Sequence, residues 1–177
     1  MQQETTRLED IDRQLHTAAF AGDVELCKKL CKANADFNSR EPNQGGLTAL
    51  HLAATSSAQK PAVRVIEYLC KVKGAHVDAC GDGGQTPLHW ACEKGHGLAV
   101  EMLCRCGARL NLVTKSGSTA LHIAARRSHL EVVKVLLAEA HGDFVNDKRP
   151  AYASMIVQNE EACCLPTSLL ATLCWGA

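Results

Sequence analysis

The chain has 177 residues, of which 46% are hydrophobic and 21% charged, a composition typical of a globular protein with a buried core. Its 19 basic residues balance its 19 acidic residues, so no overall field attracts nucleic acid or an anionic membrane. An aromatic content of 4% is also low for a surface that stacks on bases. We therefore expect no binding to nucleic acid.

The opening segment, MQQETTRLEDIDRQ, is polar and lacks the apolar stretch of a secretory signal. No uninterrupted apolar run reaches the roughly 18 residues that predict a membrane span. We expect a cytoplasmic and/or nuclear protein that does not bind membranes. In such a reducing compartment, ten cysteines indicate packing, metal binding or redox chemistry rather than a disulfide framework.

The first predicted element is a helix. Thr6-x-x-Glu9 fits a capping box that opens it, and Leu8, Ile11 and Leu15 form its apolar stripe. Within this helix the chain reads QLHTAAFAGD from Gln14, which returns later in clearer form.

Three later segments share the pattern T-[AP]-L-H-x-A-[AC]. They are LTALHLAATS from Leu47, QTPLHWACEK from Gln85 and STALHIAARR from Ser118. Thr86 and Thr119 lie 33 residues apart. A weaker copy begins at Arg149. A repeat of this length predicts a solenoid in which each unit packs on its neighbours.

The third copy predicts a helix pair. Thr86 suits the N-cap, Pro87 suits the first helical position and Gly95 suits the end of the first helix. A second apolar-periodic segment, LAVEMLCRCG, runs to Gly107. We expect Leu103 and its equivalent one unit later, Leu136, to face the core.

Motif and period resemble the ankyrin repeat. The resemblance implies an all-α solenoid of β-turn and helix-turn-helix units, about five in number, with degenerate first and last units. The expected units are 8–42, 43–80, 81–113, 114–146 and 147–165, within a domain 1–165 followed by a tail 166–177. The resemblance also implies that the repeated histidine (His16, His51, His89, His122) bonds a helix start to the neighbouring turn. It further implies a monomeric, non-enzymatic protein without a cofactor, a scaffold or adaptor that binds another protein of unknown identity.

One segment raises a competing interpretation, because His89, Cys92, Glu93 and His96 could hold a metal ion. The repeat favours a structural role, since the histidine recurs in units that lack the cysteine. Cys92 occupies a position that is alanine in the other units, and a buried thiol packs much as alanine does. Gly95 also ends the helix before His96.

Other cysteines raise the question of a thiol enzyme. Cys31, Cys70 and Cys104 each follow a leucine at what we take to be one repeat position, which indicates core packing. An enzyme that uses Cys92 or Cys104 remains the alternative to a binding protein.

Departures from the repeat are candidate functional positions. The second unit is longer than the third, and we place the extra residues between its helices, in TSSAQKPAVRV from Thr55. They form either a tolerated surface insertion or a partner-specific loop. The turn SREPNQGGL is extended by two residues relative to LVTKSGS.

Partner contacts are expected at turn tips and first-helix faces, as in the family. The candidate residues are Thr55, Ser56, Lys60, Asp82, Trp90, Glu93, Lys94, Lys115, Arg126 and Arg127. Four of them, Lys94, Lys115, Arg126 and Arg127, predict a local basic groove on a neutral protein; the alternative for the arginine pair is a solvated charged surface.

Asn38 ends the segment LCKANADFN, which resembles the site that an asparaginyl hydroxylase modifies in ankyrin repeats. The alternative is an asparagine that stabilises a turn.

The tail has three interpretations. PTSLLATLC from Pro166 resembles the start of a SOCS box, which implies a substrate-recognition subunit of a ubiquitin ligase. The terminal CWGA has the spacing of a C-a-a-X lipidation motif at Cys174. It departs from the motif at 175 and 176, where aliphatic residues are usual. The third interpretation is a broken last repeat.

Overall fold

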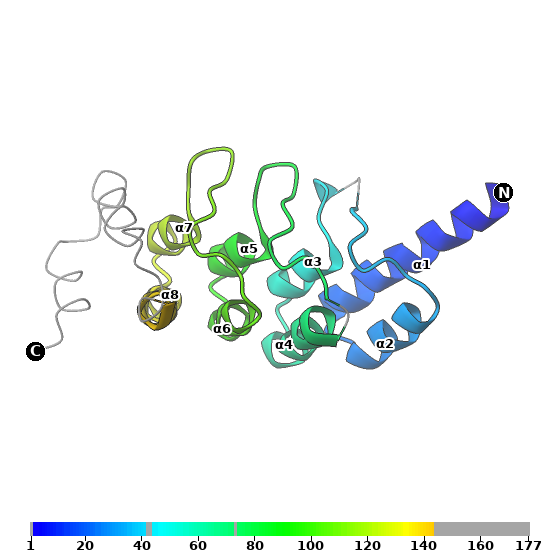
Figure 1. Ribbon diagram of the computed structural model, residues 1–177, viewed down its shortest axis with the longest axis horizontal. Helices are drawn as coiled ribbons and strands as arrows, with labels where there is room; N and C mark the ends of the chain where they lie inside the picture. Colours follow the sequence, from blue (N-terminus) through cyan, green and yellow to red (C-terminus); the bar gives the residue numbers. More distant parts are fainter. Residues whose placement is uncertain (1, 42–43, 73, 144–177) are drawn as a thin grey trace, which may run out of the picture.

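The computed structural model describes residues 2–41, 44–72 and 74–143, and it confirms the all-α solenoid. Four first helices form one row and four second helices form the other, with connecting turns projecting to one side (Figure 1). The first helices are α1 (Gln2–Ala21), α3 (Ala49–Thr55), α5 (Pro87–Lys94) and α7 (Ala120–Arg126). The second helices are α2 (Val24–Lys32), α4 (Gln59–Glu67), α6 (Gly97–Arg105) and α8 (Leu130–Asp143).

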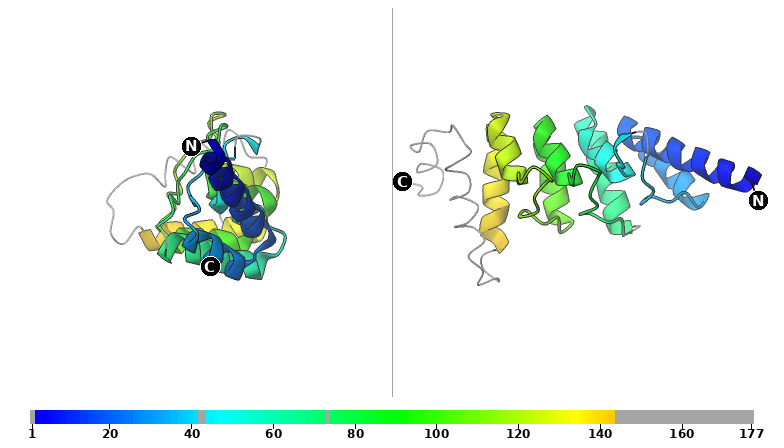
Figure 2. Two further views of the ribbon diagram at one scale, coloured as in Figure 1. Left: turned by 90° about the vertical axis from the view of Figure 1, so that its right-hand side faces the viewer. Right: turned by 90° about the horizontal axis from the view of Figure 1, so that it is seen from above.

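Seen from above, the helix pairs lie side by side along the solenoid (Figure 2). Each first helix packs on the first helix of the next unit, and α4, α6 and α8 pack in the same way. Over the described ranges, none of the helices combines the length and apolar character that crossing a bilayer requires.

The repeated threonine caps α3, α5 and α7, as predicted for Thr86. Its extended backbone (φ −90°, ψ 167°) precedes Pro87 in the first helical turn. The backbone N–H of Thr86 donates to Nδ1 of His89 at 3.1 Å, and the same 3.1 Å bond joins Thr48 to His51. The motif therefore builds its own capping box, with histidine in the place that Glu or Gln usually takes.

Gly95 ends α5 in the left-handed conformation, as predicted, with φ of 73°. A Cβ at this position would lie 2.7 Å from the ring of His129 in the next unit. Ser128 follows α7 at the equivalent point with φ of 58°, a backbone conformation that is unfavourable for residues other than glycine.

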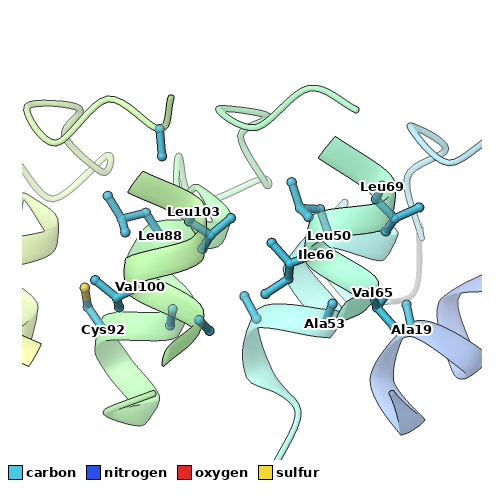
Figure 3. Packing of buried hydrophobic residues seen from close by; sticks show 14 of the residues in the cluster. Ala19, Leu50, Ala53, Val65, Ile66, Leu69, Leu88, Cys92, Val100 and Leu103 are labelled. Atoms are coloured by element: carbon cyan, nitrogen blue, oxygen red, sulfur yellow. The ribbon is translucent and has the colours of Figure 1, made fainter. Parts of the chain in front are cut away.

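The core runs between the two rows (Figure 3). Leucines from first helices, such as Leu50 and Leu88, meet aliphatic side chains from second helices, and alanines let the helices approach closely. Leu103 is 0% and Leu136 3% exposed, so both face the core as predicted.

Two expectations about helix boundaries were wrong. α1 begins at Gln2, so Thr6 lies inside the helix instead of capping it. Glutamine and glutamate are good helix formers, and they extend the helix toward the N-terminus.

The extra residues of the second unit are also not between its helices. α4 and α6 both begin 11 residues after their capping threonine. The nine residues of α4 instead continue into a five-residue π-helical segment, Tyr68–Val72, whereas α6 ends after nine residues. This longer second helix keeps Ile66 and Leu69 fully buried. Cys70 and Cys104 occupy equivalent positions as predicted, because the leucine before each accepts the N–H of the alanine in the following turn, Leu69 from Ala75 and Leu103 from Ala108; both cysteines are half-buried.

Candidate functional site: a groove between the first helices and the turns

First helices and projecting turns enclose two hollows that share Trp90, and we call them together the groove. The larger, of about 920 Å³, is lined by Arg13, His16, Thr17, Phe20, Glu41, Gln44, Leu47, Leu52, Thr55, Ser57, Trp90, Lys94 and His96. The smaller, of about 190 Å³, is lined by Gln85, His89, Trp90, Glu93, Thr114, Ser116, Ser118, Ile123 and Arg126.

Helical spacing explains which side chains reach the groove. Counted from the capping threonine, the fourth residues of the first helices are Leu52, Trp90 and Ile123. The seventh residues are Thr55, Glu93 and Arg126. Positions three apart share one face of an α-helix. This face differs in every unit, whereas the threonine, histidine and alanines of the motif repeat.

The groove has an apolar part near the first unit. Phe20 is 53% exposed there, although Leu52 beneath it is buried. Trp90 is half-buried, and its indole Nε1 is shielded from solvent without a hydrogen-bond partner among the described residues. An exposed phenylalanine beside a partly covered tryptophan is typical of a surface that binds a protein.

Within the described structure, the charged side chains of the groove that lack an ion-pair partner are both cations. Lys94 and Arg126 are exposed and form no ion pair within the part of the chain that the structure describes. Glu93 instead binds Arg127, and this contact raises the pKa of the arginine. The other groove carboxylate, on Glu41, lies 3.3 Å from Nδ1 of His16 and is 10% exposed.

The structure brings together five of the ten predicted contact residues: Thr55, Trp90, Glu93, Lys94 and Arg126. Ser56 is 1% exposed, so the prediction that its side chain contacts a partner needs correction, and Ser57 lines the groove instead. The linker between α3 and α4 is short, which turns Ser56 inward.

Four predicted residues are exposed but do not line the groove: Lys60, Asp82, Lys115 and Arg127. The predicted basic groove therefore keeps two of its four cations. Lys115 belongs to a projecting turn, where its backbone N–H donates to the carbonyl of Gly83. Arg127 is held by Glu93.

The sequence analysis missed Phe20, Leu52 and Ile123. A signal was present, because aligning QLHTAAFAGD with the clearer copies puts Phe20 at the position of Thr55, Glu93 and Arg126.

The metal and thiol interpretations of the third unit meet physical obstacles. His89 directs Nε2 at the carbonyl of Leu112 (3.1 Å), and His96 directs Nδ1 at the carbonyl of Ala54 (3.0 Å). Cys92 is fully buried, and burial raises the pKa of its thiol, which disfavours the thiolate that a nucleophile or ligand needs. Among the described residues, no group of three His, Cys, Asp or Glu side chains is placed to hold a metal ion.

The motif histidines instead join neighbouring units, as the resemblance implied. Nε2 of His51 donates to the carbonyl of Gln85 at 3.0 Å, while Nδ1 accepts the N–H of Thr48. Acceptance at Nδ1 requires a neutral ring, and burial lowers the pKa of His51 to about 4 and also lowers that of His89.

Asn38 also bridges two units. Its Oδ1 accepts the backbone N–H of His76 at 3.0 Å, and Asp78, the equivalent residue one unit later, accepts the N–H of Arg109 at 3.0 Å. The side-chain oxygen therefore stabilises the turn.

These features define a class, the helical-repeat solenoid with a groove along its first helices. Comparison with known proteins gives the family: the model for ankyrin repeats (3 copies) matches residues 15–114, 57–149 and 99–164. The chain belongs to the ankyrin repeat family.

Relatives include neurogenic locus notch homolog protein 1 of Xenopus tropicalis, 33% identical over 135 residues, which are 76% of this chain and 5% of that protein. Another is palmitoyltransferase ZDHHC13 of Homo sapiens, 35% identical over 104 residues, which are 58% of this chain and 16% of that protein. The chain thus spans less than a fifth of the relatives it matches.

The fifth unit, the tail 166–177 and the SOCS-box and lipidation hypotheses lie outside the described residues.

Proposed function

We propose that this chain is a monomeric, non-enzymatic scaffold or adaptor that binds a partner protein in the groove. Ankyrin repeats are in general protein-interaction modules, and the relatives carry the matched region as a small part of much longer proteins. The observation that carries the proposal is the combination of exposed Phe20, half-buried Trp90 and a Lys94 that has no ion pair among the described residues, on the face that differs between units. We place this function in the cytoplasm and/or nucleus, without a membrane or nucleic-acid ligand and without a cofactor.

Site-specific photocrosslinking tests this proposal. Benzoylphenylalanine replaces Phe20 in the groove, and in a matched variant it replaces Leu98, which is 44% exposed on α6 outside the groove. We expect the same partner to crosslink from position 20 and not from position 98 in cell extract, as identified by mass spectrometry. Crosslinking from position 98 alone, or from neither position, would refute the groove as the binding site.

Three narrower hypotheses rest on the sequence. A substrate-recognition role in a ubiquitin ligase requires that elongin-type adaptors co-purify with the chain, and their absence excludes it.

Hydroxylation of Asn38 requires an added oxygen on its peptide after co-expression with an asparaginyl hydroxylase; an unmodified mass counts against it. The C-a-a-X hypothesis is settled by the intact mass of protein from a eukaryotic host.

A further inference from the structure

The groove is chemically asymmetric along its length. At the first unit it presents Phe20, which is 53% exposed, above buried Leu52. Toward the fourth unit it presents Lys94 and then Arg126, which are both exposed. Trp90 lies where the two parts meet, because it lines both hollows.

Both cations are available to a ligand. The carboxylate nearest to Arg126 along the groove, that of Glu93, already binds Arg127. Glu41 lies against His16 and is largely buried. The positive charge of Lys94 and Arg126 is therefore not cancelled from within the groove, although the protein as a whole is neutral.

Trp90 offers its ring to a ligand. Its indole N–H is a donor only, and in the described structure it is shielded from solvent without an acceptor. The residue lines both hollows, so a ligand in the groove meets the ring and not the shielded N–H. Trp90 therefore extends the apolar part of the groove toward the two cations.

We propose that the groove binds an extended segment of a partner protein that combines bulky apolar side chains with Asp or Glu. The apolar side chains lie against Phe20 and Leu52, and the carboxylates lie against Lys94 and Arg126. An apolar side chain also contacts the ring of Trp90. This inference rests on the proposed function and specifies the chemistry of the partner.

The test selects ligands without knowing the natural partner. Phage-displayed random dodecapeptides are panned on the full chain and on Lys94→Glu with Arg126→Glu. The matched control is Lys29→Glu with Arg64→Glu, which reverses an exposed lysine and an exposed arginine on second helices, outside the groove. Circular dichroism checks that all variants are folded.

We expect wild-type and control selections to enrich peptides that pair Asp or Glu with aromatic or aliphatic residues. The groove variant should lose the acidic enrichment. A synthetic copy of the best peptide should bind the groove variant at least tenfold more weakly, and its affinity for wild type should fall with added salt, as expected for an ionic contact. In a Trp175→Phe background, where Trp90 is the one remaining tryptophan, binding should shift the indole emission.

Other outcomes have separate meanings. Peptides that need Phe20 and Trp90 but carry no acidic enrichment would refute this inference and leave the proposed function intact. Peptides whose binding is unaffected by Trp90→Ala and Phe20→Ala, or the absence of any selected peptide, would count against both.

Discussion

The two sides of the first helices follow different rules. On the side that faces the next unit, α3 and α5 repeat the same threonine, histidine and inner alanine, with the same capping bonds at the same 3.1 Å. On the groove side the seventh position changes from threonine to glutamate to arginine. Burial permits few residues, because each must fill a fixed space and satisfy its polar atoms, whereas the groove side is free to vary. Repetition therefore marks what folds the chain, and variation marks the side that we propose binds the partner.

The largest effect is expected from a substitution that opens a cavity in the core. Leu103→Ala should lower the free energy of unfolding by about 2 to 5 kcal/mol, since it removes a fully buried side chain and leaves a void. Leu136→Ala at the same position of α8 should behave alike. Chemical denaturation followed by circular dichroism measures both.

The matched control is Leu98→Ala on α6, because Leu98 is 44% exposed and loses far less burial. Equal losses for Leu98 and Leu103 would contradict the assignment of the core.

Acid should weaken the joints between units. The pKa of His51 is near 4 when folded, below the ordinary 6.5 that it takes when unfolded, so the unfolded chain binds a proton more readily. Its contribution to stability is therefore complete above pH 6.5 and is lost as the pH falls toward 4. At about 1.4 kcal/mol per pH unit, His51 alone accounts for roughly 3 kcal/mol across this window. His89 adds to the loss in the same direction.

Urea denaturation at a series of pH values measures this slope. His51→Asn should be less stable at neutral pH and should lose less stability on acidification. A variant with the wild-type slope would show that His51 does not carry the effect.

A smaller effect is expected where the turns of neighbouring units are joined. Asn38→Ala removes the acceptor of the His76 N–H and should cost about 1 kcal/mol. Asn38→Asp should cost clearly less, because Asp78 fills the same role one unit later. Thermal melting of the two variants side by side tests the assignment, which fails if they are equally destabilised.

The smallest effect is expected on the groove side. Lys94→Glu with Arg126→Glu should change stability by less than about 1 kcal/mol, because both side chains are exposed and unpaired within the described residues, at helix ends where a negative charge is mildly unfavourable. The melting temperature should stay close to that of wild type while binding of an acidic peptide falls. A large loss of stability would mean that the groove side also supports the fold.

Prediction from sequence succeeded where a position repeats and was weaker where it does not. The capping role of Thr86, the ending of α5 at Gly95 and the burial of Leu103 were all readable, since local backbone preference and helical spacing fix them. Half of the predicted contact residues do line the groove, because the same spacing selects the exposed face. The prediction for Ser56 was wrong by one residue, because the short linker decides which of two adjacent serines faces inward.

The sequence by itself determined the family, the all-α repeat and the residues that form the core, because these depend on a motif whose bonds are made within a unit or with its neighbour. Only the tertiary structure decided that Glu93 neutralises Arg127 and leaves Arg126 without an ion pair among the described residues, and that Phe20 of α1 faces the same groove as Trp90 of α5. Those relations join residues from different units. They depend on how the helices stack in space, which the spacing within one unit does not specify.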